Sequence, residues 1–405
     1  MRQGFFLGAG ASYELGMPLV VELTHTLKSS LGPSTLRQIR ALNSFPPGWS
    51  AIAIEEWINL LEQPNLHYEA VIGALEVQGQ RKNEHSDTYN NIRADIVSSV
   101  SYLLAEQHRQ SYTRIVIGMK YVTGFAEYLK NNAPLNIFTL NHDLIIEEIC
   151  SSLSSPLKAG FFENDEYVKS ALIGASLPFN FDTVTASQIE IEQLDFFKPG
   201  QPGVNLWKLH GSLDTFLFNN CNDFVRFRPK NLNVGDHLLM LSDLEDTSRR
   251  TQSEYGTIAS QMLTISDSKK ILQFFDRSLI TGAFKFRNKP NHRKALNVLF
   301  NNFKTKIYEI DELICIGYGF GDLHVNEALE RWLCESRTKK LTIVDPFIKQ
   351  TPSFLLHLTN QVELINKTFL EFITPPQNIT EELNLFMFQQ QREFDRIQRS
   401  RMKIG

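Results

Sequence analysis

The chain has 405 residues, of which 42% are hydrophobic and 21% charged, and its formal net charge is −4. This length fits one large domain with insertions, or two domains, and the composition is that of an ordinary globular protein. The small negative charge gives no electrostatic reason to expect binding to nucleic acid or to an acidic membrane surface. No apolar run approaches the ~20 residues of a membrane span, and the start of the chain does not read as a signal peptide. We therefore expect a cytoplasmic globular protein.

The cysteines give no sign of a metal site or a disulfide framework. The sequence has four of them, none at a C-x-x-C spacing: Cys150, Cys221, Cys315 and Cys334. Reduced thiols in a cytoplasm are the simplest interpretation, and no bound metal is expected.

The first predicted element is a short strand that ends in a glycine-rich turn. The apolar run Gly4–Leu7 leads into Gly8-Ala9-Gly10-Ala11-Ser12, after which a helical pattern begins. A turn with so few side-chain atoms lets backbone N–H groups and a helix N-terminus approach a phosphate closely. Only two glycines of the dinucleotide-binding fingerprint are present, because Tyr13 occupies the third position. Taken alone, the segment is explained equally well by an ordinary strand–helix turn.

Residues from about 19 to 132 predict a large helical insertion. Leu19, Leu23, Leu27 and Leu31 recur every four residues, and further apolar stripes follow without a strong strand pattern. We interpret these stripes as core packing.

A second buried strand is predicted at Leu135–Leu140, and three polar residues, Asn141, His142 and Asp143, follow it. Ligands of open α/β sheets bind beyond the carboxyl ends of the strands, so these residues are candidates for a site. Asn141 or Asp143 can also cap the following helix. Three adjacent polar residues exceed what one cap requires, which favours a role in ligand binding.

A third strand is predicted at Val204–Leu209, and it ends in His210 and Gly211. A histidine at a strand end is well placed for proton transfer or for a hydrogen bond to a ligand hydroxyl. The alternative is a structural histidine, which is the commoner case for a lone histidine at a turn.

Two segments around this strand, at about 151–203 and 215–305, have irregular or mixed patterns and predict further insertions. Within the second segment, the arginines and lysine near Pro229 predict a solvated basic face, and Thr247–Glu254 predicts an exposed loop. The three basic residues are Arg226, Arg228 and Lys230.

The strand Glu312–Ile316 leads into a second glycine-rich turn, Gly317-Tyr318-Gly319-Phe320-Gly321-Asp322, and then into a helix. A last strand, Leu341–Val344, ends in Asp345, which either bonds ribose hydroxyls or begins a turn before Pro346. Residues 376–405 predict a C-terminal helical tail that docks on the core or on a partner.

The order of these motifs, GAGAS, TLNHD, LHGS, IGYGFGD and a strand ending in Asp, resembles that of the sirtuin-type Rossmann fold. More narrowly, it is similar to the divergent sirtuin-like effectors of bacterial anti-phage defence, which hydrolyse NAD. The match spans residues 4–346, apart from the insertions. The resemblance implies an α/β class with a Rossmann-like parallel sheet, in a domain of residues 1–375.

The resemblance also implies roles for individual residues. Asn141 would position the attacking water beside the nicotinamide ribose, Asp143 would hold the carboxamide, and His210 would be the active-site base. The residues that would bind the rest of NAD are Gly8, Ala9, Gly10, Ala11 and Ser12 at the pyrophosphate, and Gly317, Tyr318, Gly319 and Asp345 at the adenosine half.

Two departures from the deacylating sirtuins favour plain NAD cleavage to nicotinamide and ADP-ribose. Those enzymes carry a zinc module of two cysteine pairs after the His-Gly motif, and this chain has none. Their glycine–isoleucine–proline segment runs into an Asp-Phe-Arg loop, whereas Gly16-Met17-Pro18 continues here as Leu19-Val20-Val21. A deacylase or ADP-ribosyltransferase remains an alternative, as does a non-catalytic subunit that senses NAD or ADP-ribose.

Ungated NAD hydrolysis would be toxic, so the activity is expected to be gated and to deplete NAD in abortive infection. The resemblance implies a homo-oligomer, often with a separately encoded activator or sensor such as a HerA-type ATPase.

Overall fold

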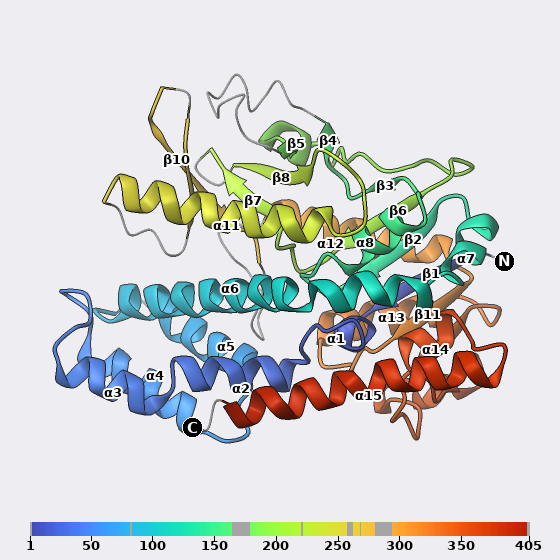
Figure 1. Cartoon of the computed structure of the whole chain (residues 1–405), viewed down its shortest axis with the longest axis horizontal. Coiled ribbons are helices and arrows are strands. Elements are labelled where there is room, and N and C mark those ends of the chain that lie inside the picture. Colours follow the sequence, from blue (N-terminus) through green and yellow to red (C-terminus); the bar gives the residue numbers. More distant parts are fainter. Residues whose placement is uncertain are drawn as a thin grey trace.

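A seven-stranded parallel sheet with helices on its faces organises the chain (Figure 1). The computed structural model describes residues 2–81, 83–163, 179–219, 222–256, 262–267, 269–279 and 294–402, without the side chains of 294–296 and 399–402. The strand order is β13-β12-β11-β1-β2-β6-β3. The bounds are β1 Gln3–Leu7, β2 Leu135–Thr139, β3 Leu157–Lys158, β6 Val204–Lys208, β11 Glu312–Ile316, β12 Lys340–Val344 and β13 Val362–Ile365.

The inner strands of this sheet are short, mainly apolar runs because helices cover both of its faces. β2 and β6 are buried at every position, and β1 and β11 at every position but the first. The predicted α/β class with a parallel, Rossmann-like sheet is thereby confirmed. The five predicted strands agree with the structure to within one residue at either end.

The carboxyl ends of the central strands lie side by side. Leu7 of β1 is in register with Ile316 of β11 on one side and with Thr139 of β2 on the other. The chain continues from β1 towards β2, but from β11 towards β12, so the direction of the connections reverses between β1 and β11. Such a switch point leaves a crevice at the carboxyl edge, which is where open α/β sheets bind their ligands.

The segment between β1 and β2 forms a layer of helices. Its long helix α6 packs against α2, α4 and α5 on one side and against α11 (Asp236–Glu254) on the other (Figure 1). Over its described residues, the insertion predicted at about 19–132 therefore consists of helices and the turns that connect them. The bounds are α1 Ala9–Tyr13, α2 Val20–Ser30, α3 Pro33–Ala41, α4 Ala51–Glu62, α5 Tyr68–Gln80, α6 Ser86–Gly118, η1 Met119–Tyr121 and α7 Phe125–Asn131.

A second, antiparallel sheet occupies the segments that the sequence predicted only as mixed. Its described strands lie in the order β4-β5-β8-β7-β10-β9. The ring of Phe227, which is fully buried, is the centre of an aromatic core in this sheet. The bounds are β4 Phe162–Glu163, β5 Phe179–Val184, β7 Thr215–Phe218, β8 Asp223–Pro229, β9 Met262–Ser266 and β10 Leu272–Arg277.

Two predictions for this region are wrong. Arg226 does not belong to a solvated face: it is buried in β8, between carboxylates that are remote in the sequence. Thr247–Glu254 is not an exposed loop but the last part of α11, where Ser248 and Thr251 are buried and the Ser248 hydroxyl accepts a hydrogen bond from the Thr264 backbone.

The C-terminal helix α15 is docked on the segment that follows the first glycine turn (Figure 1). Arg392 is 3% exposed and donates hydrogen bonds to the backbone oxygens of Tyr13 and Met17. The predicted C-terminal helix is thus confirmed. The remaining bounds are α8 Ile145–Ser152, α10 Ala186–Glu190, α12 Lys294–Lys306, η3 Ile307–Glu309, α13 Leu323–Cys334, η4 Ser353–Gln361, α14 Phe369–Ile373 and α15 Ile379–Met402. None of the helices in the described ranges has the length and apolar character that crossing a membrane requires.

Candidate functional site

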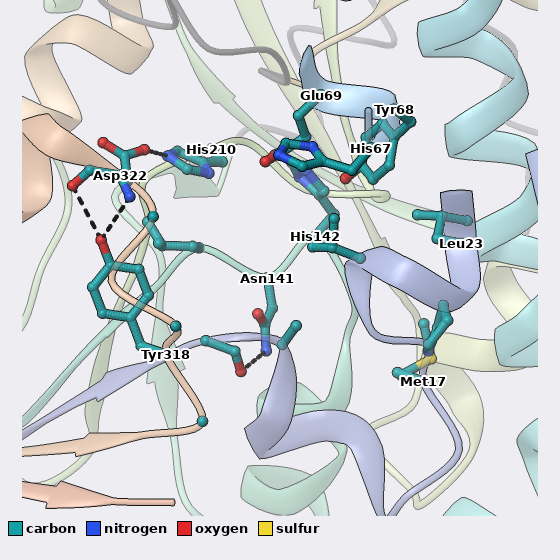
Figure 2. A pocket seen from close by; sticks show the side chains of 18 of the residues that line it. Met17, Leu23, His67, Tyr68, Glu69, Asn141, His142, His210, Tyr318 and Asp322 are labelled. Atoms are coloured by element: carbon teal, nitrogen blue, oxygen red, sulfur yellow. Dashed lines mark hydrogen bonds and ion pairs between the residues drawn. The ribbon is translucent and has the colours of Figure 1, made fainter. Parts of the chain in front are cut away.

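A cavity of about 750 Å³ lies at the carboxyl edge of the parallel sheet, at the switch point (Figure 2). The turns after β1, β2, β6 and β11 form one side of it. The first residues of α2 and α5 in the helical layer, together with part of α6, form the other. Its volume falls within the roughly 300–1,000 Å³ of ordinary small-molecule sites.

The cavity brings together most of the residues that the sequence singled out. Asn141 and His210, which follow β2 and β6, both line it (Figure 2). Asp345 lies outside the lining, where its Oδ1 accepts a hydrogen bond from the Phe347 backbone at 2.8 Å. Gly10, Ala11 and Ser12 are not among the residues that line the cavity. The other predicted residues in the lining are Gly8, Ala9, Asp143, Gly317, Tyr318 and Gly319.

The two glycine turns pack backbone against backbone. The Gly10 N–H donates to the Gly317 oxygen at 3.0 Å, and the Gly8 N–H donates to Ile316. A Cβ added at Gly10 would meet the Cα of Gly317 at 2.7 Å, and one added at Gly317 would meet the backbone of Ala11 at 2.5 Å. These glycines are therefore required by the contact between the turns, and their presence does not by itself indicate a bound phosphate.

Two other glycines have no such explanation. Gly319 and Gly321 line the cavity, a Cβ at either would meet nothing within 4 Å, and neither has a left-handed backbone. Their missing side chains leave room beside the backbone where a ligand can approach it closely. In the second turn, Gly317 thus packs against the first turn, whereas Gly319 and Gly321 lie open to the cavity.

We expect Gly317→Ala and Gly319→Ala to differ sharply in stability. Gly317 has φ +62° and no room for a Cβ, so alanine there should lower the free energy of unfolding by about 2 kcal/mol or more. Gly319→Ala should change it by less than ~0.5 kcal/mol, because nothing is displaced. Urea denaturation of the two variants measures this difference, and equal losses would contradict the packing described above.

Asn141 is held by the first turn. Its Nδ2 donates to the Gly8 oxygen at 2.9 Å and to the Ser12 hydroxyl at 3.0 Å. Both amide hydrogens are therefore used within the protein, and Oδ1 is the atom through which Asn141 can accept a hydrogen bond from a ligand or a water. Ser12 in turn bonds the carboxyl group of Asp143, so one buried hydroxyl fixes both polar side chains.

Asp143 is buried at the base of the cavity. Burial raises the pKa of its carboxyl group, although Lys208 and the Ser12 hydroxyl act in the opposite direction. Its Oδ1 also accepts a hydrogen bond from the Ile145 backbone at 3.1 Å, which helps to begin α8. Asp143 thus lines the cavity and also bonds the first backbone N–H of α8, whose N-cap position is occupied by Leu144.

A buried ion network supports the floor of the cavity. Lys208, at the end of β6, donates to the Asp143 backbone and lies 3.1 Å from a Glu147 oxygen. Arg226 of β8 lies 3.3 Å from the same oxygen and 2.7 Å from Asp214. His210 and Asp214 belong to the same loop, which follows β6. The ion pair between Asp214 and Arg226 therefore connects this loop to β8 of the second sheet.

His210 faces a partner that the sequence did not single out. Its Nε2 lies 3.2 Å from Oδ2 of Asp322, and both side chains are at most 10% exposed. Asp322 also begins α13, because its Oδ1 accepts from the backbone of His324 and Val325. A polar residue directly before a predicted helix was the only sequence signal for it.

His142, a candidate from the sequence to which no role was assigned, also lines the cavity, and its ring lies 6.4 Å from that of His210. Two further polar residues of the cavity were missed: His67 and Glu69 come from the helical layer (Figure 2). The last two lie at the start of α5, in a region whose apolar stripes indicated only core packing. Nothing in their local sequence connects them with the strand ends.

Within the described residues, no cluster of three or more His, Cys, Asp or Glu side chains is arranged to hold a metal ion. No protein-family model matches this chain, and no curated protein matches it.

Proposed function

We propose that the chain is an NAD+ glycohydrolase, which cleaves the bond between nicotinamide and ribose. The observation that carries the proposal is the meeting of Asn141 and His210 in one cavity at the switch point of the sheet. Their strands, β2 and β6, are neighbours, and the two glycine turns border the same cavity. An amide acceptor and an imidazole beside a crevice of this kind suit a reaction in which a water attacks a bound nucleotide.

The reaction needs little covalent chemistry from the protein. Nicotinamide leaves readily because its ring nitrogen is cationic in NAD+, and the ribose becomes oxocarbenium-like as the C1′–N bond breaks. Water adds to C1′ and loses a proton, so that NAD+ and water give nicotinamide, ADP-ribose and a proton.

The residues of the cavity have distinct roles in this proposal. Asp143 holds the carboxamide, and Oδ1 of Asn141 accepts a hydrogen bond from the attacking water. His210 acts as the base, with ribose hydroxyls beside it. The open backbone at Gly319 and Gly321 receives the adenosine half, next to the two turns.

The wider setting belongs to the same proposal and rests on the order of the motifs. It comprises the sirtuin type of the Rossmann-like sheet, a gated role in anti-phage defence, assembly into a homo-oligomer, and activation by a separately encoded partner such as a HerA-type ATPase.

The test is incubation of the full chain with NAD+, over a range of protein concentrations and with candidate partners, followed by chromatography of the products. Nicotinamide and ADP-ribose in equal amounts are expected. ADP-ribose binding in calorimetry without nicotinamide release would instead indicate a sensor, and turnover of an acetyl-lysine peptide a deacylase.

Asn141→Ala is expected to lower the rate of NAD+ loss by about 10²-fold, because the attacking water loses its acceptor. The matched control is Asn132→Ala. Asn132 also makes two hydrogen bonds, to Gln3 and Tyr128, but at the amino end of β1. Asn132→Ala should retain the parent rate while losing comparable stability. Equal rates for the two variants would remove Asn141 from the mechanism.

A further inference from the structure

The carboxylate of Asp322 contacts two parts of the structure, the start of α13 and the side chain of His210. Oδ1 accepts hydrogen bonds from the first backbone N–H groups of α13, at 3.1 Å from His324 and 3.4 Å from Val325. Oδ2 lies 3.2 Å from Nε2 of His210. The carboxylate therefore cannot turn away from His210 without exposing the start of α13, so the helix fixes the direction of Oδ2.

The loop that carries Asp322 is braced by the hydroxyl of Tyr318. That hydroxyl accepts from the Asp322 N–H at 3.2 Å and lies 3.1 Å from the Asp322 backbone oxygen (Figure 2). It also lies 3.0 Å from Oδ1 of Asn326. Burial and the nearby Asp322 carboxylate raise the pKa of Tyr318, so its hydroxyl keeps its proton and remains a donor. Tyr318 thus holds the loop and also lines the cavity, where the resemblance implies a contact with the adenosine half.

We propose that Asp322 is the positioning residue of His210, with Tyr318 as its support; this rests on the proposed function. A carboxylate oxygen only accepts hydrogen bonds, so the imidazole nitrogen that faces it carries the proton. Asp322 thereby selects the Nε2–H tautomer of His210 and leaves the lone pair on Nδ1. The pairing also crosses the switch point, since His210 follows β6 and Asp322 follows β11 on the other side of β1.

Asp322→Asn separates the positioning role from the structural one. The asparagine keeps a carbonyl oxygen for the start of α13 but presents an NH₂ group to His210, which favours the opposite tautomer. We expect kcat for NAD+ cleavage to fall by about 10²-fold or more, with KM nearly unchanged and the melting temperature preserved. Asp322→Ala should lower the melting temperature as well, because it also removes the cap.

The second measurement does not depend on activity. In ¹⁵N NMR spectra, assigned with His210→Gln, the proton of His210 should lie on Nε2 in the parent and on Nδ1 in Asp322→Asn. The matched control is Glu148→Gln, because Glu148 pairs with another buried histidine, His237, at 3.2 Å and away from the cavity. This control should leave both the His210 signal and NAD+ cleavage unchanged.

The two proposals fail in different ways. If the parent does not cleave NAD+ under any condition, the proposed function is wrong, and the tautomer of His210 still tests the pairing. If the parent cleaves NAD+ and Asp322→Asn does so at the same rate with the same tautomer, the positioning role is wrong. Should Asp322→Asn fail to fold, Tyr318→Phe replaces it, because this variant keeps the ring beside Phe6 and Phe320. Its kcat should fall without the rise in KM that the loss of a nucleotide contact would cause.

Discussion

Replacing His210 with alanine is expected to lower kcat for NAD+ cleavage by about 10²–10⁴-fold, the usual contribution of a general base. The residual rate should reflect binding and the acceptor at Asn141, which the substitution leaves in place. Steady-state release of nicotinamide measures the loss, and calorimetry with ADP-ribose shows whether the cavity still binds nucleotide. Retained binding together with lost turnover is the expected combination.

The control for this experiment is His237→Ala. His237 is 4% exposed and lies 3.2 Å from Glu148, so it resembles His210 in burial and in its acidic partner, but it does not line the cavity. Its loss should lower stability and spare kcat. If both histidine variants cleave NAD+ equally well, the assignment of the base is wrong.

Arg226→Met is expected to lower the free energy of unfolding by about 3–5 kcal/mol, because Asp214 and Glu147 are then left buried beside fewer positive charges. The control lies two residues along the same strand. Arg228 is partly exposed and pairs with the buried Asp182 and the exposed Glu163, so Arg228→Met should cost less, about 1–2 kcal/mol. Guanidinium denaturation of the two variants makes the comparison, and similar losses would contradict a buried network centred on Arg226.

The same network predicts how acid affects the fold. Burial raises the pKa of Asp214, but the charges of Arg226 and Lys208 outweigh burial and leave that pKa below its ordinary value of 3.8. The unfolded chain therefore binds this proton at a higher pH than the folded chain does. The stabilisation is complete above pH ~4 and is lost as the pH falls through the lowered pKa. Arg226→Met should weaken this dependence, as measured by denaturation in the parent and the variant at pH 5 and pH 3.

Five strands of the parallel sheet could be predicted because each is a short, mainly apolar run that ends in glycine or polar residues. The two edge strands were not predicted, because β3 has only two residues and β13 alternates apolar residues with Glu363. The second sheet could not be predicted either. In β8 the apolar residues alternate with Arg226 and Arg228, and Arg226 becomes buried only because its partners Asp214 and Glu147 approach from remote parts of the chain. The local sequence pattern contains no information about such pairing. The charged residues of β8 therefore led to the wrong prediction of a solvated face.

The residues of the candidate site that directly follow predicted strands could be predicted from the sequence. Asn141 and His210 follow predicted strands directly, and the edge of a parallel sheet gathers such residues. Asp322 was not predicted as a site residue. Its contact with His210 joins the ends of β11 and β6, which are separated in the sheet by β1 and β2. His67 and Glu69 come from the helical layer, and only its packing over the sheet brings them to the cavity.

The central place of β1 has a consequence for biosynthesis. Gln3 pairs with Glu312, and Arg392 of α15 bonds the backbone of Tyr13 and Met17, so the start of the chain depends on segments that the ribosome makes much later. Contacts of such long range form slowly and only after the intervening polypeptide is available. A nascent chain therefore carries Asn141 and His210 well before β11 and the turn that follows it can complete the cavity around them.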